Sequence, residues 1–263
     1  MLTSNGHVLD TSPDRLGRLD PVPDAERHDR DALWRRLRAD GYLWLRGALD
    51  PGAVRGFREF YFAHVDPEAP RAEQRRGLFG RVVPGEEYRR FCAQPAIRDW
   101  YAWFLGGDTF LHRRKILRHI RPGEAGVGTA TQAHYDLVYL REGTDRVLSS
   151  WIPLGDCPVE LGGLVYLERS HLRVLAEEAA GTLRRPAASI TADLPALARQ
   201  QDARWLLADY AAGDMVVHSA HIIHASLDNT GDAVRLSTDI RYQRADQPID
   251  WRWQQHWHLD DGL

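Results

Sequence analysis

The stretch TQAHYDLVYL, residues 131–140, places an imidazole and a carboxylate two positions apart in a run rich in aromatic and branched apolar side chains. This composition is typical of a half-buried β-strand, in which alternate side chains point to the same face. His134 and Asp136 are therefore expected to converge on one point beside the strand. A second histidine at that point would complete a set of two histidines and one carboxylate, which holds an octahedral metal ion and leaves three positions open.

The candidates for the second histidine are His218, His221 and His224, in GDMVVHSAHIIHASLDN at 213–229. The turn-forming residues DNTGD follow, and Arg235 comes eleven residues after His224. A hairpin closed by this turn would bring Arg235 back near His224, where a guanidinium can hold a carboxylate of a dicarboxylate co-substrate in a bidentate pair. This register favours His224 as the ligand and leaves the other two histidines in supporting positions. An ion pair with the acids of the turn is the plainer interpretation of Arg235.

The rest of the chain predicts one domain that is mainly β with flanking helices. Residues 1–107 show mostly helical apolar spacing behind a polar surface strap at 1–20. Residues 108–245 consist of short β-rich runs separated by Gly, Pro and Asp, which favours an antiparallel jelly roll over a βαβ sheet. Helical sequence at 172–210 interrupts these runs and is expected to form a lid-like insertion. Residues 246–263 form a Trp-rich tail.

Composition excludes several classes of protein. The 263 residues are 43% hydrophobic, which is enough for one full core. With 34 basic and 37 acidic residues the net charge is −3, and the charges are spread along the chain, so a nucleic-acid partner is not expected. Two cysteines and an N-terminus without an apolar core favour the reducing cytoplasm over secretion. No apolar run is long enough to cross a membrane.

Four segments in order carry a resemblance to a known family. They are GYLWLRGALDPGAV (41–54), HYD (134–136), WIPLGDCPVELGGLVYLERSH (151–171) and GDMVVHSAHIIHASLDNTGDAVR (213–235). Over about residues 40–245 the chain resembles the phytanoyl-CoA dioxygenase-like branch of the iron(II)- and 2-oxoglutarate-dependent oxygenases.

This resemblance implies a cupin-like jelly roll, the double-stranded β-helix, with iron(II) held by His134, Asp136 and His224. It also implies that 2-oxoglutarate chelates the iron at two positions and dioxygen takes the third. The far carboxylate of 2-oxoglutarate would meet Arg235 and Ser226, and Trp151 would line the co-substrate pocket. A carboxylate ligand at Asp136 argues against halogenation, because chloride needs that position.

The resemblance further implies a dioxygenase that oxidises a C–H bond of a small molecule, by hydroxylation or oxidative cyclisation. Among the 34 basic residues one is a lysine, and such Arg-rich chains are typical of GC-rich bacteria, where relatives of this branch often modify natural products, antibiotics included. The insertion favours a polar or sugar-bearing substrate, since guanidinium and indole groups bind hydroxyls and sugar faces. The insertion residues concerned are Arg184, Arg185, Arg199, Arg204 and Trp205.

Two other interpretations of the sequence remain. One is a metal-dependent β-barrel isomerase or hydrolase that uses the same three ligands without 2-oxoglutarate, with Arg235 as a substrate anchor. The other is a jelly-roll module that binds a small molecule or sugar without catalysis. Release of succinate from 2-oxoglutarate separates the first from an oxygenase, and the iron content of anaerobically prepared protein separates the second.

Overall fold

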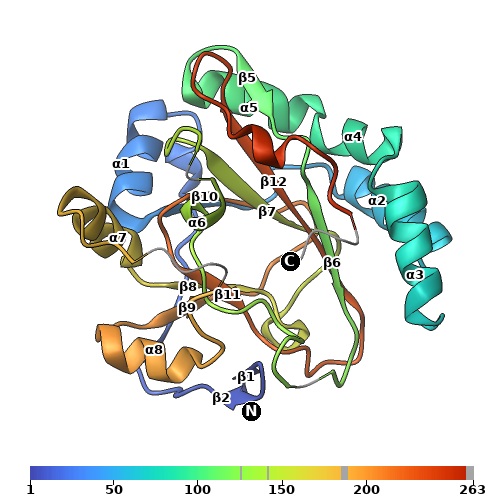
Figure 1. Cartoon of the computed structure of the whole chain (residues 1–263), viewed down its shortest axis with the longest axis horizontal. Coiled ribbons are helices and arrows are strands. Elements are labelled where there is room, and N and C mark those ends of the chain that lie inside the picture. The colour runs from blue at the N-terminus through green and yellow to red at the C-terminus, as the bar shows by residue number, and fades with distance from the viewer. Residues whose placement is uncertain (125, 141, 185–188, 259–263) are drawn as a thin grey trace.

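Two sheets face each other, both antiparallel apart from one parallel pair of strands in the smaller sheet, and helices cover the outer face of the larger sheet (Figure 1). The computed structural model of the protein describes residues 1–124, 126–140, 142–184 and 189–258. Apolar side chains from both sheets meet between them, among them Trp44 and Val216 of the larger sheet and Tyr166 and Leu206 of the smaller. This arrangement is the predicted jelly roll.

Six strands make up the larger sheet, in the order β4–β10–β7–β12–β5, with β6 also paired to β12. Their bounds are Tyr42–Leu45 (β4), Thr109–Leu111 (β5), Ile116–Ile120 (β6), Leu148–Pro153 (β7), Met215–Ser219 (β10) and Arg235–Arg244 (β12). Along the longest strand, β12, alternate side chains face the helical layer and the barrel interior. Leu236, Ile240 and Tyr242 pack into the core under the helices. The odd-numbered residues from Arg235 to Arg241 lie on the opposite face, toward the barrel interior, so this strand separates the helical layer from the interior.

The smaller sheet has the order β11–β8–β9–β3. Its strands are Leu16–Arg18 (β3), Leu164–Leu167 (β8), Trp205–Leu207 (β9) and His224–Ser226 (β11). The N-terminal strap includes β3 and a small hairpin, Thr3–Ser4 (β1) with His7–Val8 (β2). The carboxylate of Asp228 accepts the backbone N–H groups of Asn5 and Gly6 at 2.8 and 3.0 Å, which ties this strap to the barrel.

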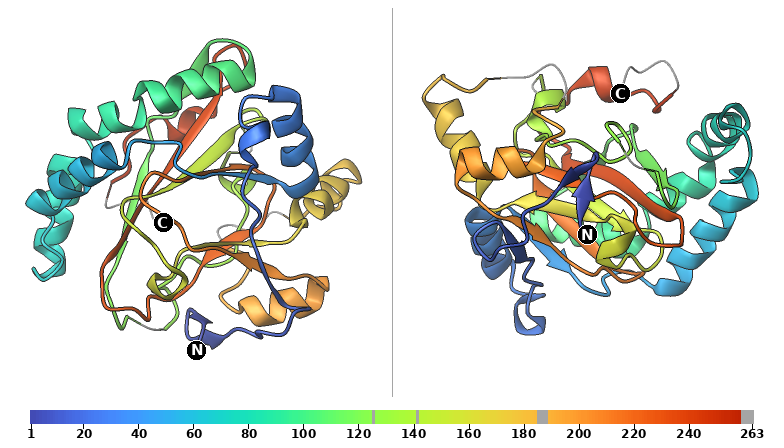
Figure 2. Two further views of the ribbon diagram at one scale, coloured as in Figure 1. Left: turned by 180° about the vertical axis from the view of Figure 1, so that it is seen from behind. Right: turned by 90° about the horizontal axis from the view of Figure 1, so that it is seen from below.

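The N-terminal half is mostly helical, as predicted. Asp29 accepts two backbone N–H groups at the start of the first long helix, and Gly41 closes that helix with a φ of 81°. Asp50 caps the second in the same way, with Pro51 as its first residue. These helices bury their apolar faces against the larger sheet (Figure 2). The bounds are Arg30–Asp40 (α1), Pro51–His64 (α2), Arg71–Gly77 (α3), Leu78–Val82 (η2), Glu86–Cys92 (α4) and Pro95–Leu105 (α5).

The predicted strand at 131–140 is wrong for most of its length. His134 forms an isolated bridge with His224, and the chain then turns into a single helical turn, Leu137–Leu140 (α6). The N–H of Leu137 donates to the carbonyl of Ala220 at 2.8 Å, which holds this turn against the barrel. A short apolar run satisfies a buried strand or a buried helical turn equally well, so periodicity does not separate the two.

The predicted insertion at 172–210 is helical in part, but its C-terminal part belongs to the smaller sheet. It contains Ser170–Ala179 (α7) and Leu194–Gln201 (α8), but residues 205–207 form β9 within the smaller sheet. Trp205 is 1% exposed and its indole N–H donates to the carbonyl of Leu194 at 2.9 Å. Arg204 pairs with Glu168 at 2.7 Å, and Arg185 lies outside the described residues. Trp205 is therefore a core residue and not part of a lid.

Gly162 marks the close approach of β8 to the segment that follows β11. Its φ is +78°, and a Cβ there would lie 2.5 Å from the carbonyl oxygen of Leu227. Gly123 has a similar φ of +73° with open space around it. We expect Gly162→Ala to lower the free energy of unfolding by roughly 3 kcal/mol and Gly123→Ala by about 1 kcal/mol, since only the first adds a backbone clash to left-handed strain. Urea unfolding checks this, and equal losses would contradict it.

Three short 3₁₀ helices complete the described part of the chain, at Asp24–Glu26 (η1), Val159–Leu161 (η3) and Trp251–Trp253 (η4). Within the described ranges, every helix is too short or too polar to cross a membrane.

Candidate functional site

His134 and His224 face each other across the gap between two chain segments. Their backbones pair in both directions, at 3.0 and 2.9 Å, and their ring centroids are 4.2 Å apart. Each Nδ1 lies close to a backbone carbonyl, that of Gln132 at 2.9 Å and that of Ile222 at 3.0 Å. Because a carbonyl only accepts, each Nδ1 carries the proton and each Nε2 presents a lone pair. Both rings are thus set as metal ligands.

The Asp136 carboxylate lies beside these rings and is held on both oxygens. Its Oδ1 is 3.8 Å from Nε2 of His134 and accepts a hydrogen bond from Nη2 of Arg241 at 3.0 Å. Its Oδ2 accepts from the hydroxyl of Ser149, and Nε2 of His218 is 3.5 Å away. The ligand atoms of His134, Asp136 and His224 all lie within 4.8 Å of one another. The structure therefore brings together the three residues chosen from the sequence.

Burial and charge set the protonation states of this triad. Burial lowers the pKa of His134, and burial together with the neighbouring rings of His134 and His218 lowers the pKa of His224 well below its usual value. Burial alone would raise the pKa of Asp136, but Arg241 and the nearby histidines outweigh it and hold that pKa well below its ordinary range. Neutral imidazoles beside an ionised carboxylate are the forms that bind a metal ion.

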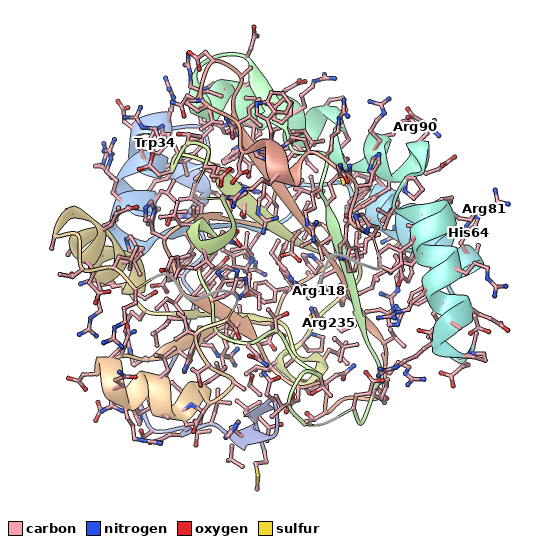
Figure 3. The ribbon with its side chains drawn as sticks, in the orientation of Figure 1. Trp34, His64, Arg81, Arg90, Arg118 and Arg235 are labelled. Carbon is pink, nitrogen blue, oxygen red and sulfur yellow. The ribbon has the colours of Figure 1, made fainter. Side chains whose placement is uncertain are left out.

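Arg235 lies deeper in the same cavity, on the first residue of β12. It is 2% exposed, and burial lowers the pKa of its guanidinium. Its Nη1 donates to the hydroxyl of Ser237 at 3.0 Å, whereas Nε and Nη2 have no hydrogen-bond partner among the described residues. Figure 3 shows Arg235 near Arg118 at β6. A buried guanidinium with unused N–H groups is costly unless a carboxylate pairs with it.

The predicted hairpin between His224 and Arg235 is wrong, although both residues reach the same cavity. β11 pairs with β8 in the smaller sheet, and β12 pairs with β6 and β7 in the larger. The DNTGD turn therefore carries the chain from one sheet to the other. The two side chains meet because the sheets face each other.

Ser226 and Trp151 also line this cavity. The hydroxyl oxygen of Ser226 accepts the backbone N–H of Thr131 at 2.8 Å, which leaves its own proton to donate. Trp151 packs on Tyr210 with ring centroids 4.8 Å apart and is 3% exposed, so it is a core side chain as well as a wall of the cavity.

Arg241 and Ser149 were not among the predicted site residues, and the closeness of His218 to Asp136 was not predicted. A signal for Arg241 was present, because polar residues occupy every second position of β12 from 235 to 241. These residues are Arg235, Ser237, Asp239 and Arg241. In a strand this pattern puts all of them on one face, here the interior of the barrel. No comparable pattern marks Ser149, which lies in a fully buried strand.

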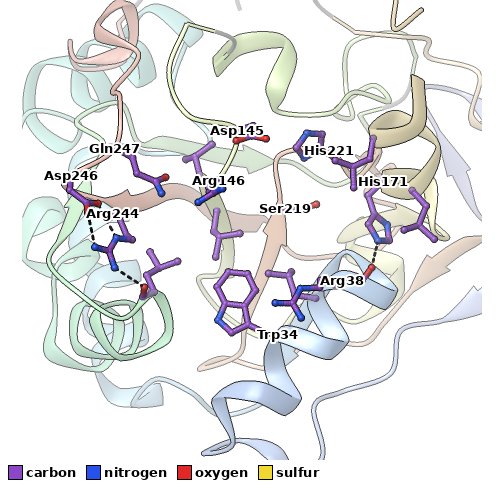
Figure 4. Close-up of a pocket in the computed structure, with 16 residues that line it drawn as sticks. Trp34, Arg38, Asp145, Arg146, His171, Ser219, His221, Arg244, Asp246 and Gln247 are labelled. Carbon is purple, nitrogen blue, oxygen red and sulfur yellow. Dashed lines mark hydrogen bonds and ion pairs between the residues drawn. The ribbon is translucent and has the colours of Figure 1, made fainter. Parts of the chain in front are cut away.

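A larger cavity lies elsewhere. It has a volume of about 960 Å³ and lies between α1, α7 and the strand ends of β7 and β10, with Trp34, Ser219 and His221 among its walls (Figure 4). His221 pairs there with Glu178 at 3.1 Å, close to Asp145. The triad residues do not line this cavity. His221, a predicted alternative ligand, therefore faces a different part of the molecule.

Iron(II) and 2-oxoglutarate fit the triad cavity on two observations. Two nitrogens and one carboxylate form the donor set that non-heme iron(II) takes in oxygenases. The unused N–H groups of Arg235 meet the need of a distal carboxylate for a bidentate partner. The three ligand residues and Arg235 line the same cavity.

Comparison with known proteins agrees with this fit. The family model for phytanoyl-CoA dioxygenase (PhyH) matches residues 37–237. A 1-deoxypentalenic acid 11-beta-hydroxylase from Streptomyces exfoliatus is 26% identical over 233 residues, which cover 82% of each chain. Among solved structures, the non-heme alpha-ketoglutarate-dependent carbocyclase SnoK from nogalamycin biosynthesis is 22% identical, covers 93% of this chain and 92% of its own, and has a TM-score of 0.63.

A second solved structure, the epimerase SnoN in complex with Fe3+, alpha-ketoglutarate and nogalamycin RO, is 22% identical with a TM-score of 0.62 and covers 84% of this chain and 85% of its own. The fold, the buried triad and the family match over most of the chain agree. The chain belongs to the phytanoyl-CoA dioxygenase family and is an oxygenase that uses iron(II) and 2-oxoglutarate.

Proposed function

We propose that this protein is a dioxygenase that oxidises a C–H bond of a small secondary metabolite, by hydroxylation or oxidative cyclisation. Iron(II) is held by His134, Asp136 and His224. The far carboxylate of 2-oxoglutarate binds Arg235 with help from the hydroxyl of Ser226. The observation that carries the proposal is the buried guanidinium with unused N–H groups in the cavity of a two-histidine, one-carboxylate triad.

Iron(II) with 2-oxoglutarate supplies, from dioxygen, the oxidant that removes hydrogen from an unactivated carbon, and succinate and carbon dioxide are the co-products. The residues of the chain position these partners. Ser149 donates to one oxygen of Asp136, and Arg241 donates to the other, which lies 3.8 Å from Nε2 of His134. Trp151 and Leu164 give the cavity apolar walls, which disfavour water there.

The similar proteins support the class of substrate. One is named as a hydroxylase of 1-deoxypentalenic acid, and two others belong to the biosynthesis of nogalamycin. Trp205 and Arg204 of the insertion do not support the predicted polar or sugar-bearing substrate, since Trp205 is in the core and Arg204 pairs with Glu168. The class of substrate is therefore inferred below from the residues that line the cavities near the triad.

The test is a reaction under labelled dioxygen. Purified protein loaded anaerobically with iron(II) and 2-oxoglutarate is exposed to ¹⁸O₂ with a panel of secondary metabolites. We expect succinate above the background measured without a substrate, with one labelled oxygen in succinate and, for a hydroxylation, one in the product. A cyclisation leaves the label in succinate and water and lowers the product mass by two hydrogens.

The two rival functions predict different results. A metal-dependent isomerase or hydrolase would convert its substrate without oxygen and release no succinate. A non-enzymatic binding module would take up no stoichiometric iron. Either result would contradict the proposal.

A further inference from the structure

A narrow cavity leads from the protein surface toward the triad. It has a volume of about 350 Å³ and lies at β6, between Leu117–His119 on one side and residues 128–131 on the other. We call this cavity the β6 slit. Arg118 and Thr131 line both the β6 slit and the triad cavity. The β6 slit and the triad cavity therefore adjoin at these two side chains.

The outer end of the β6 slit carries positive charge. Arg75 of α3 lines it, and also lines an adjoining surface cavity of about 280 Å³ together with Arg71, Arg121 and Glu124. Glu124 accepts a hydrogen bond from Arg121 at 2.8 Å and lies 4.0 Å from Arg71, so the carboxylate is already engaged. Arg75 is exposed, and its guanidinium has no ion-pair or hydrogen-bond partner among the described residues.

Polar and apolar side chains line the slit behind this cationic end in similar measure. Leu78 and Phe79 of η2 form one wall, Leu117 of β6 and Ala130 belong to others, and Trp257 of the C-terminal tail packs edge-on against Phe79 with centroids 4.9 Å apart. Together with the adjoining cavity, the slit has the size of small-molecule sites in proteins. A cavity with an aromatic wall at Phe79 and Trp257 and a free guanidinium at one end matches an amphipathic anion.

The interior end of the path is also cationic. Arg118, Arg235 and Arg241 line the triad cavity against two carboxylates, Asp136 and Asp239. A divalent metal ion adds two positive charges and the 2-oxoglutarate dianion adds two negative ones, so the described residues keep an excess of one positive charge. The electric field along the path attracts anions and rejects cations, which raises the local concentration of an anionic substrate.

We propose that the substrate is a carboxylic acid with an apolar portion that enters through the β6 slit, with its carboxylate held by Arg75. Its hydrocarbon body lies against Phe79, Leu117 and Trp257, and its far end passes Arg118 and Thr131 to the triad. This inference rests on the proposed function, because it names the substrate class of the same site. It assigns to Arg75 a role in binding and selection of the substrate, with no part in the chemical step.

The experiment measures binding, not turnover. Protein loaded with nickel(II), which replaces iron without supporting the reaction, and with 2-oxoglutarate is titrated with dansyl-undecanoic acid and with its methyl ester, and dansyl fluorescence is recorded. We expect the acid to bind at least tenfold more tightly than the ester. Arg75→Glu is expected to weaken binding of the acid about tenfold, or roughly 1.4 kcal/mol, and to leave binding of the ester unchanged.

Arg76→Glu is the matched control. Arg76 is the next residue of the same helix and is also exposed, but it lines neither the slit nor the adjoining cavity. The same change of charge there is expected to alter binding of the acid less than twofold. Equal loss in both variants would mean that only net charge matters and would overturn the role of Arg75.

Other outcomes overturn the inference without touching the proposed function. Equal binding of acid and ester, no binding of the acid, or tighter binding of a neutral dansyl glucoside would each reject an acidic substrate in the slit. A dansyl-alkyl phosphate that binds tenfold more tightly than the carboxylate would reject the choice of carboxylate. The proposed function fails by a different measurement, namely absence of bound iron or of 2-oxoglutarate-dependent succinate.

Discussion

Asp136→Ala will remove iron from the protein and abolish turnover of 2-oxoglutarate, and His134→Ala and His224→Ala will do the same. Each variant leaves two donors where the ion needs three. The loss at Asp136 has a second cause, since Arg241 donates to that carboxylate at 3.0 Å and would stand unneutralised beside the cation. We expect turnover below about a thousandth of the wild-type rate, equivalent to roughly 4 kcal/mol. Iron content after anaerobic loading and succinate release measure the two effects.

His221→Ala and His218→Ala are the controls for this prediction. His221 is a buried histidine three residues from His224, but it faces the larger cavity and pairs with Glu178, so its loss should leave the iron content intact. His218 lies 3.5 Å from Asp136 without being one of the three converging ligands, so its loss should weaken iron binding about tenfold. If His221→Ala lost iron and His224→Ala kept it, the assignment of the third ligand would be wrong.

Arg235→Ala will raise the 2-oxoglutarate requirement steeply and leave iron binding unchanged. Arg235 is 2% exposed, and its Nε and Nη2 make no hydrogen bond to the described residues. Removing one member of a desolvated charge pair costs on the order of 3 kcal/mol, or roughly a hundredfold in affinity. The dependence of succinate formation on 2-oxoglutarate concentration measures this loss. Unchanged dependence would remove Arg235 from the co-substrate site.

The unfolding temperature tests the same role of Arg235, because the effect of the substitution should differ between the empty and the 2-oxoglutarate-bound protein. Without 2-oxoglutarate the buried charge of Arg235 is a cost, so Arg235→Met should leave the unfolding temperature of the empty protein unchanged or raise it. Addition of 2-oxoglutarate with nickel(II) should then stabilise the wild type and not the variant. Arg90→Ala is the control and should behave as the wild type in both tests. Arg90 is an exposed residue of α4 that pairs only with Glu87, at 3.5 Å, among the described residues (Figure 3).

Local sequence signals predicted the elements whose causes are local. Asp50 and Pro51 start one helix, and Gly41 and Gly106 end two others, because caps and left-handed glycines act within a few residues. The same kind of signal failed at 137–140, where burial against Ala220 and the core converts an apparent strand into a helical turn. It failed also at Trp205, which looked like part of a lid and is a core residue of β9.

By itself, the sequence determined the class of the protein, since the order of HYD, the distal histidines and Arg235 carries the family pattern. The hairpin register that favoured His224 over His218 and His221 is wrong, although His224 is the histidine that lies beside His134 and Asp136. Only the tertiary structure decided how these residues meet. His224 and Arg235 lie in different sheets, so a barrel and not a hairpin brings them into one cavity. The contacts of Arg241 and Ser149 with Asp136 likewise join the paired strands β12 and β7 to the turn that carries Asp136. Local patterns record the face on which a side chain lies, whereas contact across a barrel depends on the packing of both sheets.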